Sequence, residues 1–176
     1  KPIMGVELDP HNGFAVIGEP KVLIMHNSEK YGWEAQWNKD GISRNGWNEG
    51  ANMIKHNGKY YLQYAAPGTE LRGYADGVYI GDSPLGDFVP QESNPFSIKP
   101  GGFIGGAGHG NTFYDKYGNL WHVATMKISV NHMFERRIGL SPAFFAEDGS
   151  LHANTVWMDY PFRVPQEKVD FSKNDF

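Results

Sequence analysis

Three features are absent from this sequence or are present at a low level, and each one excludes a class of function. There is no cysteine, which excludes disulfides, thiol nucleophiles and thiolate metal sites. No apolar run approaches the roughly 20 residues that a membrane-spanning helix needs, so we expect no membrane partner. Charged residues make up only 20% of the chain, and the net charge is −4 at pH 7, which argues against a nucleic-acid partner.

The residues that are present describe a folded, turn-rich chain. A length of 176 residues corresponds to one domain or a piece of a larger one. The hydrophobic fraction of 40% can support a core, and 22 glycines with 11 prolines provide many turns. Residues 1–6 lack both an initiator methionine and an apolar signal region. We therefore expect a processed or cut N-terminus, which says nothing about export.

An internal repeat organises the chain. A strand, a polar turn with a glycine, an aromatic-rich second strand and a third strand closed by Ser-Pro all occur twice. The turn glycines Gly58 and Gly118 are 60 positions apart. The strands expected in the first copy are 50–55, 60–65, 77–80 and a short one near 88–89. Those expected in the second copy are 109–114, 120–126, 136–140 and 151–157.

Repeats of about four short strands are typical of β-propeller blades. We therefore predict an all-β fold, a β-propeller, with inserted loops that lengthen the repeat. Because a propeller has at least four blades, the chain would supply about two and a half to three of them. The predicted divisions are the end of one blade plus a long loop (1–46), two complete blades (47–105 and 106–158), and a tail or the start of a further blade (159–176).

The N-terminal division is expected to contain short strands and then a long irregular segment. Strands are predicted at 3–8, 14–17 and 21–25, with a break at the Gly-Glu-Pro of residues 18–20. Residues 26–46 show little periodicity and are predicted to form a long loop, which in an ordered protein is often functional.

Glu49 and His109 are the candidate functional residues. They are 60 positions apart and are interpreted as the same place in the two repeats, at the entry of the first strand. First strands of propeller blades line the central channel, so both side chains are predicted to point into one pocket. The alternative is that Glu49 is a solvated loop residue and His109 a turn residue.

The aromatic residues have two interpretations. Trp33, Trp37 and Trp47 lie in or beside the long loop, where their rings could stack on sugars or could staple the loop to a blade. We treat Trp33 and Trp47 as candidate substrate-binding residues. Alternating side chains of the second strands are predicted to form the core between blades, at 60, 62 and 64 and at 120, 122 and 124. The remaining histidines show no close pairing of the kind that makes a zinc site.

The motif at residues 47–51, with the hairpin at 56–62 and the segment 106–111, resembles glycoside hydrolase family 43. The segments 121–126 and 134–140 resemble a subset of its bacterial members, so the resemblance covers nearly the whole chain. It implies a five-bladed β-propeller with a carbohydrate substrate. It also implies glycosidase activity on plant-type α-L-arabinofuranosyl or β-D-xylosyl linkages, and a secreted or periplasmic location.

The resemblance also implies roles for single residues. The family uses an Asp general base, a second Asp that tunes the acid, and a Glu general acid, which Glu49 matches. His109 matches a histidine that in many members binds calcium directly or through water, so Ca²⁺ is an expected cofactor. An arginine on the third strand of that blade often reaches the site. Arg136 or Arg137 would match, and strand alternation lets only one of them point inward.

The two family Asp residues belong to the blades before the one with Glu49, and neither Asp9 nor Asp40 matches them. We therefore expect an inverting hydrolase with Glu49 as general acid, and we expect this chain alone to be inactive. One alternative is a non-catalytic carbohydrate-binding propeller fragment. Another is a structural piece that completes a propeller with the missing blades or with a second copy of the chain.

Overall fold

The computed structural model describes residues 1–38, 41–43, 46, 48–128, 132 and 135–173. Regular structure in this part is almost entirely β. The strands are β1 Ile3–Asp9, β2 Ala15–Ile24, β3 Gln36–Asn38, β4 Gly41–Ser43, β5 Glu49–His56, β6 Lys59–Ala66, β7 Ala75–Gly81, β8 Phe88–Pro90, β9 Gly105–Tyr114, β10 Leu120–Lys127, β11 Arg136–Phe145 and β12 Leu151–Ala153. Two short 3-10 helices, η1 Gly32–Glu34 and η2 Thr155–Asp159, accompany them. None of the helices described is long and apolar enough to cross a membrane.

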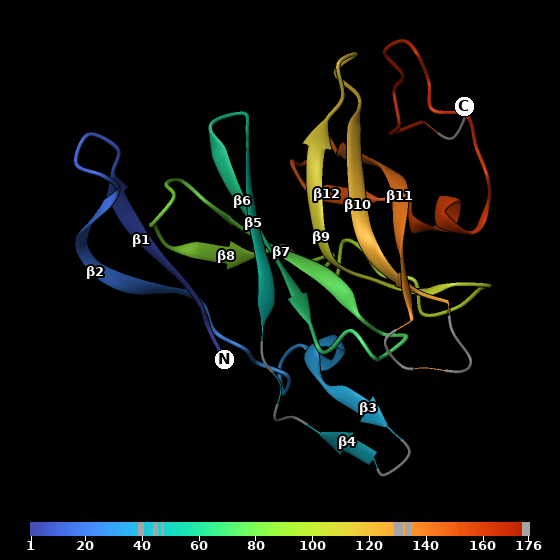
Figure 1. Ribbon diagram of the computed structural model, residues 1–176, viewed down its shortest axis with the longest axis horizontal. Helices are drawn as coiled ribbons and strands as arrows, with labels where there is room; N and C mark the ends of the chain where they lie inside the picture. Colours follow the sequence, from blue (N-terminus) through green and yellow to red (C-terminus); the bar gives the residue numbers. More distant parts are fainter. Residues whose placement is uncertain (39–40, 44–45, 47, 129–131, 133–134, 174–176) are drawn as a thin grey trace.

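Two four-stranded antiparallel sheets carry the predicted repeat, in the orders β5-β6-β7-β8 and β12-β11-β10-β9. Figure 1 shows them beside each other, with β9 of the second sheet against the strands of the first. Successive strands pair in each sheet, as in a propeller blade. The turn between β5 and β6 forms where the sequence predicts it. Asn57 and Gly58 have φ of 46° and 81°, as the two-residue turn that suits strand twist requires.

The core between the two sheets is built from the second strands together with β7, β11, β12 and the segment before β9. The buried cluster comprises Tyr61, Val78, Phe96, Leu120, Ala143 and Leu151. The Tyr61 hydroxyl donates to the Gly149 carbonyl at 2.7 Å and so links the two sheets. Alternate residues of a strand face opposite ways, and Leu62 and Tyr64 accordingly pack on the other face, toward the N-terminal hairpin. Of the six predicted core positions, 62, 64, 120, 122 and 124 are buried, which confirms them as core, whereas Tyr60 is only partly buried.

β1 and β2 form a separate two-stranded sheet that contacts the first blade through Ile3 and Ile24. The predicted break at residues 18–20 is wrong, because β2 runs through them as one strand. The pairing shifts register there, since Glu7 lies opposite Ile17 and Gly5 opposite Lys21. The extra residues form a bulge, which is a place where a strand tolerates glycine and proline.

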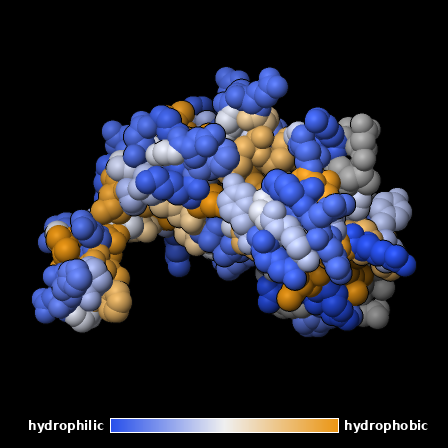
Figure 2. Space-filling view, turned by 90° about the horizontal axis from the view of Figure 1, so that it is seen from above, coloured by the Kyte–Doolittle hydropathy of each residue, from blue (hydrophilic) through white to orange (hydrophobic). Residues whose placement is uncertain are grey.

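The N-terminal hairpin stands away from the body of the protein, as Figure 2 shows. Its apolar side chains are uncovered: Leu8, Phe14 and Val16 are 45%, 66% and 60% exposed. Isolated exposed apolar residues are ordinary, but a contiguous group on one hairpin marks a surface that fits a protein neighbour.

Two further sequence predictions are corrected. Residues 26–46 are not an irregular loop in the part described, because they contain η1 and the β3-β4 hairpin. Short strands of three residues leave too little periodicity to be seen in the sequence. The expected strand at 151–157 ends at Ala153, where Asn154 leads into η2. The described part of the C-terminal tail contains no strand.

Candidate functional site

The first strand of each four-stranded sheet has a β-bulge near its start. In β5 the pairing leaves Gly50 and Ala51 opposite a single residue of β6. In β9 it leaves His109 and Gly110 opposite Ala124 alone. A bulge re-aims the side chains around it and is common next to active sites.

The bulges correct the predicted alignment of the two repeats. Sequence analysis placed Glu49 and His109 at equivalent positions. The backbone hydrogen bond between Asp115 and Asn119 extends the pairing of β9 with β10, so the turn between them comprises residues 116–118, against 57–58 in the first sheet. Because of this extra residue, equivalent positions are 59 residues apart in the first strands and 60 apart in the second strands. His109 is therefore equivalent to Gly50, and Glu49 to Gly108.

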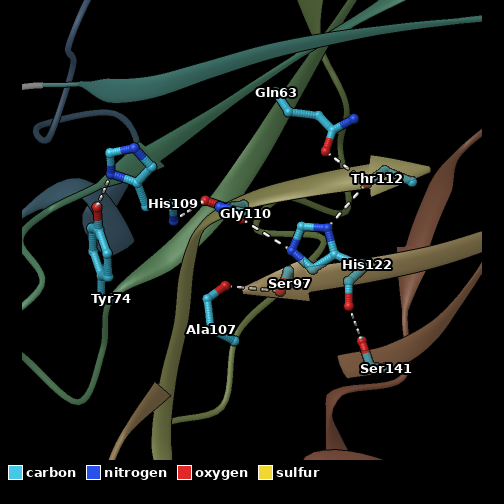
Figure 3. A network of polar contacts seen from close by, with 10 residues as sticks. Gln63, Tyr74, Ser97, Ala107, His109, Gly110, Thr112, His122 and Ser141 are labelled. Carbon is cyan, nitrogen blue, oxygen red and sulfur yellow. Dashed lines mark hydrogen bonds and ion pairs between the residues drawn. The ribbon is translucent and has the colours of Figure 1, made fainter. Parts of the chain in front are cut away.

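Glu49 and His109 nevertheless lie together, joined by a tyrosine that the sequence analysis missed. The Tyr74 hydroxyl donates to Glu49 Oε1 at 2.6 Å. It also lies 3.3 Å from His109 Nδ1, a contact that Figure 3 shows. His109 Nδ1 is 3.9 Å from Glu49 Oε1. The Glu49 and His109 side chains are 36% and 52% exposed, whereas Tyr74 is buried. An acid and an imidazole that solvent can reach are thus connected through a buried hydroxyl.

The electrostatics keep Tyr74 a neutral donor. Burial raises the pKa of its phenol, and the hydrogen bond to Glu49 raises it further. A phenol that keeps its proton at all physiological pH values donates one strong hydrogen bond to a carboxylate. Tyr74 therefore fixes Glu49 Oε1, and the second carboxylate oxygen is the one that can exchange a proton with a ligand.

A cavity of about 350 Å³ opens beside His109 and is lined by Gly50, Asn52, Thr125 and Ile138, among others. A larger cavity of about 620 Å³ lies toward the outer ends of the strands, around His56, Tyr114 and Phe145, and does not include Glu49 or His109. We assign the site to the smaller one, because His109 lines it together with residues from the first strands of both sheets. Glu49 does not line this cavity, and it is connected to it through its contacts with Tyr74 and His109.

Asp76 is the second residue that the sequence analysis missed. It lies on β7, is 1% exposed, and accepts the backbone N–H of His109 at 2.7 Å and of Gly110 at 2.8 Å. Its Oδ2 is 3.1 Å from Nε2 of the buried His122. A sequence signal existed: Tyr74 and Asp76 are two residues apart, immediately before and within the first two residues of an otherwise apolar strand, so extended backbone places them on one face. A carboxylate in such a strand requires partners.

The three tryptophans of this region, of which Trp33 and Trp47 were the candidates for sugar binding, have different outcomes. Trp33 is half-buried against Tyr64, with ring centroids 5.5 Å apart, so it does fasten the loop to the first blade. It also lines a separate 320 Å³ cavity together with Arg72, so a sugar contact stays a prediction. Trp47 lies outside the described residues, as does the side chain of Trp37.

The two candidate arginines differ in direction. Arg136 Nη1 donates to Thr69 Oγ1 on the preceding blade at 3.1 Å, and its charge acts on Tyr74. Arg137 turns back along its own strand, donating to the Arg136 carbonyl at 2.8 Å and lying 3.4 Å from Glu135. Arg136 is thus the one that reaches toward the site.

The surroundings of His109 do not fit a calcium ion by themselves. Calcium takes about six to eight oxygen ligands, whereas Glu49 is the only carboxylate paired with His109 in the part of the chain described. Over the same residues, no group of three or more His, Asp or Glu side chains could hold a metal. We assign no chemical step to a metal here.

Comparison with known proteins places this geometry in a family. The profile of the family described as Glycosyl hydrolases family 43 matches residues 3–151. The chain belongs to glycosyl hydrolase family 43. The paired sheets are therefore blades of the family's five-bladed β-propeller, and the N-terminal hairpin adds part of another blade. A search of curated proteins finds no match.

Solved structures of family 43 enzymes resemble the chain over most of its length. A thermostable family-43 glycoside hydrolase is 27% identical, with a TM-score of 0.64 over 87% of this chain and 46% of that one. A xylan β-1,4-xylosidase from Bacillus halodurans C-125 is 19% identical, with a TM-score of 0.69 over 86% and 27%. An α-L-arabinofuranosidase from Lactobacillus brevis is 19% identical, with a TM-score of 0.59 over 82% and 45%. The chain spans less than half the length of each of these structures.

Proposed function

We propose that the protein to which this chain contributes is an inverting glycoside hydrolase of α-L-arabinofuranosyl or β-D-xylosyl linkages, with Glu49 as general acid. The observation that carries the proposal is the contact of Glu49 with Tyr74. This hydrogen bond holds one oxygen of a solvent-accessible carboxyl group at the channel end of a family 43 blade. The other oxygen then delivers the proton to the departing sugar oxygen.

His109 and Arg136 complete the proposed sugar pocket. His109 Nδ1 is directed to Tyr74, so its Nε2 is the ring atom that would hold a substrate hydroxyl. Arg136 approaches the same place from the third strand of the second blade. A calcium ion at His109 and a location outside the cytoplasm both stay predictions.

The general base is assigned to a segment outside this chain. An inverting enzyme needs a second carboxylate roughly 6.5–9.5 Å from the acid, with a water molecule between them. The buried carboxylates Asp76 and Glu34 are unsuited to this role, because each is closed to solvent and occupied by hydrogen bonds. We therefore propose that the chain alone binds sugar without turning it over.

The test uses the protein with its further blades and aryl α-L-arabinofuranosides and β-D-xylosides as substrates. Glu49→Gln should lower kcat by about 100-fold or more on substrates with a poor leaving group. The loss should be much smaller for a dinitrophenyl leaving group, which departs without a proton. Glu147→Gln, in the turn before β12, is the matched control and should leave the rates unchanged. Equal rates for Glu49→Gln and wild type would exclude Glu49 as the acid.

A non-catalytic carbohydrate-binding role is the second candidate, favoured by the absence of an accessible second carboxylate at the site among the described residues. Calorimetry with arabinose, xylose and their oligomers would distinguish the two. Sugar binding without turnover in the protein with its further blades would support the binding role and overturn the hydrolase.

A further inference from the structure

The strand that carries His109 is held in an unusual conformation. His109 has a φ of 54°, and Ala107, two residues earlier, has a φ of 100°. A non-glycine residue with positive φ costs about 1–3 kcal/mol and persists only where surrounding contacts hold it. The β9 bulge falls at the same place, so the ladder with β10 is interrupted at His109 and Gly110. Something other than the ladder must hold this backbone.

Asp76 supplies the missing acceptors. Its Oδ1 accepts the N–H of His109 and its Oδ2 accepts the N–H of Gly110, so one carboxylate binds both residues of the bulge. The fit leaves no space, since a Cβ atom at Gly110 would lie 2.5 Å from both Asp76 Oδ2 and His122 Nε2. Backbone N–H groups donated to a carboxylate are among the stronger hydrogen bonds in a protein.

Asp76 is itself held in place, through both its backbone and its carboxylate. Its backbone exchanges hydrogen bonds with Ser97, at 2.8 and 3.2 Å. His122, at 3.1 Å from Oδ2, is fully buried and is held through Nδ1 by Thr112, at 3.0 Å. Thr112 in turn donates to Gln63 on the first blade at 2.7 Å (Figure 3). The network therefore joins β6 and β7 of one blade to β9 and β10 of the next.

The segment 74–76 therefore contacts both the backbone and the ring of His109. Asp76 holds its backbone, and Tyr74, two residues earlier, contacts its ring and Glu49. We propose that Asp76 is a positioning residue: it clamps the β9 bulge, and so sets the place of the His109 imidazole relative to Tyr74 and Glu49. The expected effect of Asp76 on turnover rests on the proposed function, whereas its expected effect on the β9 backbone does not.

The first test needs no variant and no activity. In the chain of residues 1–176, amide hydrogen exchange followed by NMR should show His109 and Gly110 exchanging as slowly as paired ladder amides of β10, although the His109 side chain is exposed. Fast exchange at both amides, like that of an exposed turn, would overturn the clamp.

The second test is a pair of double-mutant cycles on kcat/KM, in the protein with its further blades. Asp76→Asn keeps the shape of the side chain but replaces one acceptor with an NH₂ group. It should lower kcat/KM by about 100-fold, the cost of an approximately 1 Å misplacement. If Asp76 acts through His109, Asp76→Asn should cost almost nothing further in a His109→Ala background.

Asp115→Asn is the matched control. Asp115 also accepts two backbone N–H groups, from Tyr117 and Asn119, but at the far end of the same hairpin. Its effect should multiply independently with that of His109→Ala. Independent effects of Asp76→Asn and His109→Ala would refute positioning and leave Asp76 a general stabiliser. If the wild-type protein turns over no glycoside, the proposed function fails, while slow exchange of the two amides still supports the clamp.

Discussion

A substitution at Gly50 would test whether the position of the His109 ring controls activity, because Gly50 is subject to two constraints. Its φ is +62°, in the left-handed region, and a Cβ atom built on it would lie 2.8 Å from His109 Cδ2 and 2.9 Å from Cγ. Gly50→Ala therefore adds backbone strain and pushes against the imidazole at once. Ordinary contact begins at 3.4 Å, so the ring must retreat by 3.4 − 2.8, or about 0.6 Å.

The magnitudes follow from these two effects. An alanine in the left-handed region costs about 1–2 kcal/mol of stability. The ring displacement lengthens a Tyr74–His109 contact that is already 3.3 Å, beyond which a hydrogen bond weakens steeply. Since an approximately 1 Å misplacement can cost about 100-fold in rate, we expect Gly50→Ala to lower kcat/KM by about ten- to a hundredfold.

Gly58→Ala separates the strain from the displacement. Gly58 also has a left-handed φ, +81°, but an added Cβ would meet nothing within 4 Å. Urea unfolding should give both variants a similar loss of stability. Only Gly50→Ala should lose kcat/KM on aryl glycosides, and only it should shift the His109 ring signals in NMR spectra of the chain. Equal activities for the two variants, or unmoved His109 signals, would refute the reasoning.

Three further predictions concern single polar contacts. Tyr74→Phe removes the hydrogen bond to Glu49 and should lower kcat/KM by about tenfold or more, together with about 1.5–3 kcal/mol of stability in urea unfolding; unchanged kinetics would show that the Glu49 contact is not used. Tyr64→Phe removes a donor at 2.6 Å from the fully buried Glu34 and should cost about 1–3 kcal/mol by the same measurement; a neutral result would mean that Glu34 finds another donor. Burial alone would raise the pKa of Asp115, but hydrogen bonds, led by that from the Trp121 indole, hold it down to about 2, below the ordinary 3.8. Its contribution to stability is therefore complete above pH 3.8 and is lost as pH falls toward 2, so unfolding midpoints of Asp115→Asn should depend less on pH across this window than those of wild type.

Local chemistry made some elements predictable from the sequence. The Asn57-Gly58 turn follows from two residues that accept positive φ. The burial of Leu62, Tyr64 and Leu120 follows from alternation, but the burial of the opposite face of β6, including Tyr61, does not. The path of β2 through Pro20 did not follow, because the bulge that accommodates it depends on pairing with β1. The β3-β4 hairpin was missed because its strands are only three residues long.

The residues of the site also differ in whether the sequence alone identifies them. Glu49 and His109 were identifiable because each stands beside glycines near the start of a repeat, although their exact equivalence was wrong. Tyr74 and Asp76 were not, because their roles depend on which blade faces them. In the sequence they are two polar residues just before a predicted strand. Only the docking of β9 against β7 brings Tyr74 to the His109 ring and makes Asp76 the acceptor of the His109 backbone N–H. His122 was predicted as core and is core, yet its contact with Asp76 depends on the same docking.

The corrected alignment of the repeats explains why both glycine-rich stretches are needed. Where the first blade has Gly50, the second has His109, and where the first has Glu49, the second has Gly108. A Cβ atom at Gly50 would strike His109, and one at Gly108 would lie 2.7 Å from the Tyr74 ring that holds Glu49. Each blade thus supplies one functional side chain and, at the neighbouring position, the space that the other blade's side chain requires. A residue larger than glycine at either position would separate the acid from the imidazole. The contact between Glu49 and His109 therefore depends on a glycine from each of the two blades.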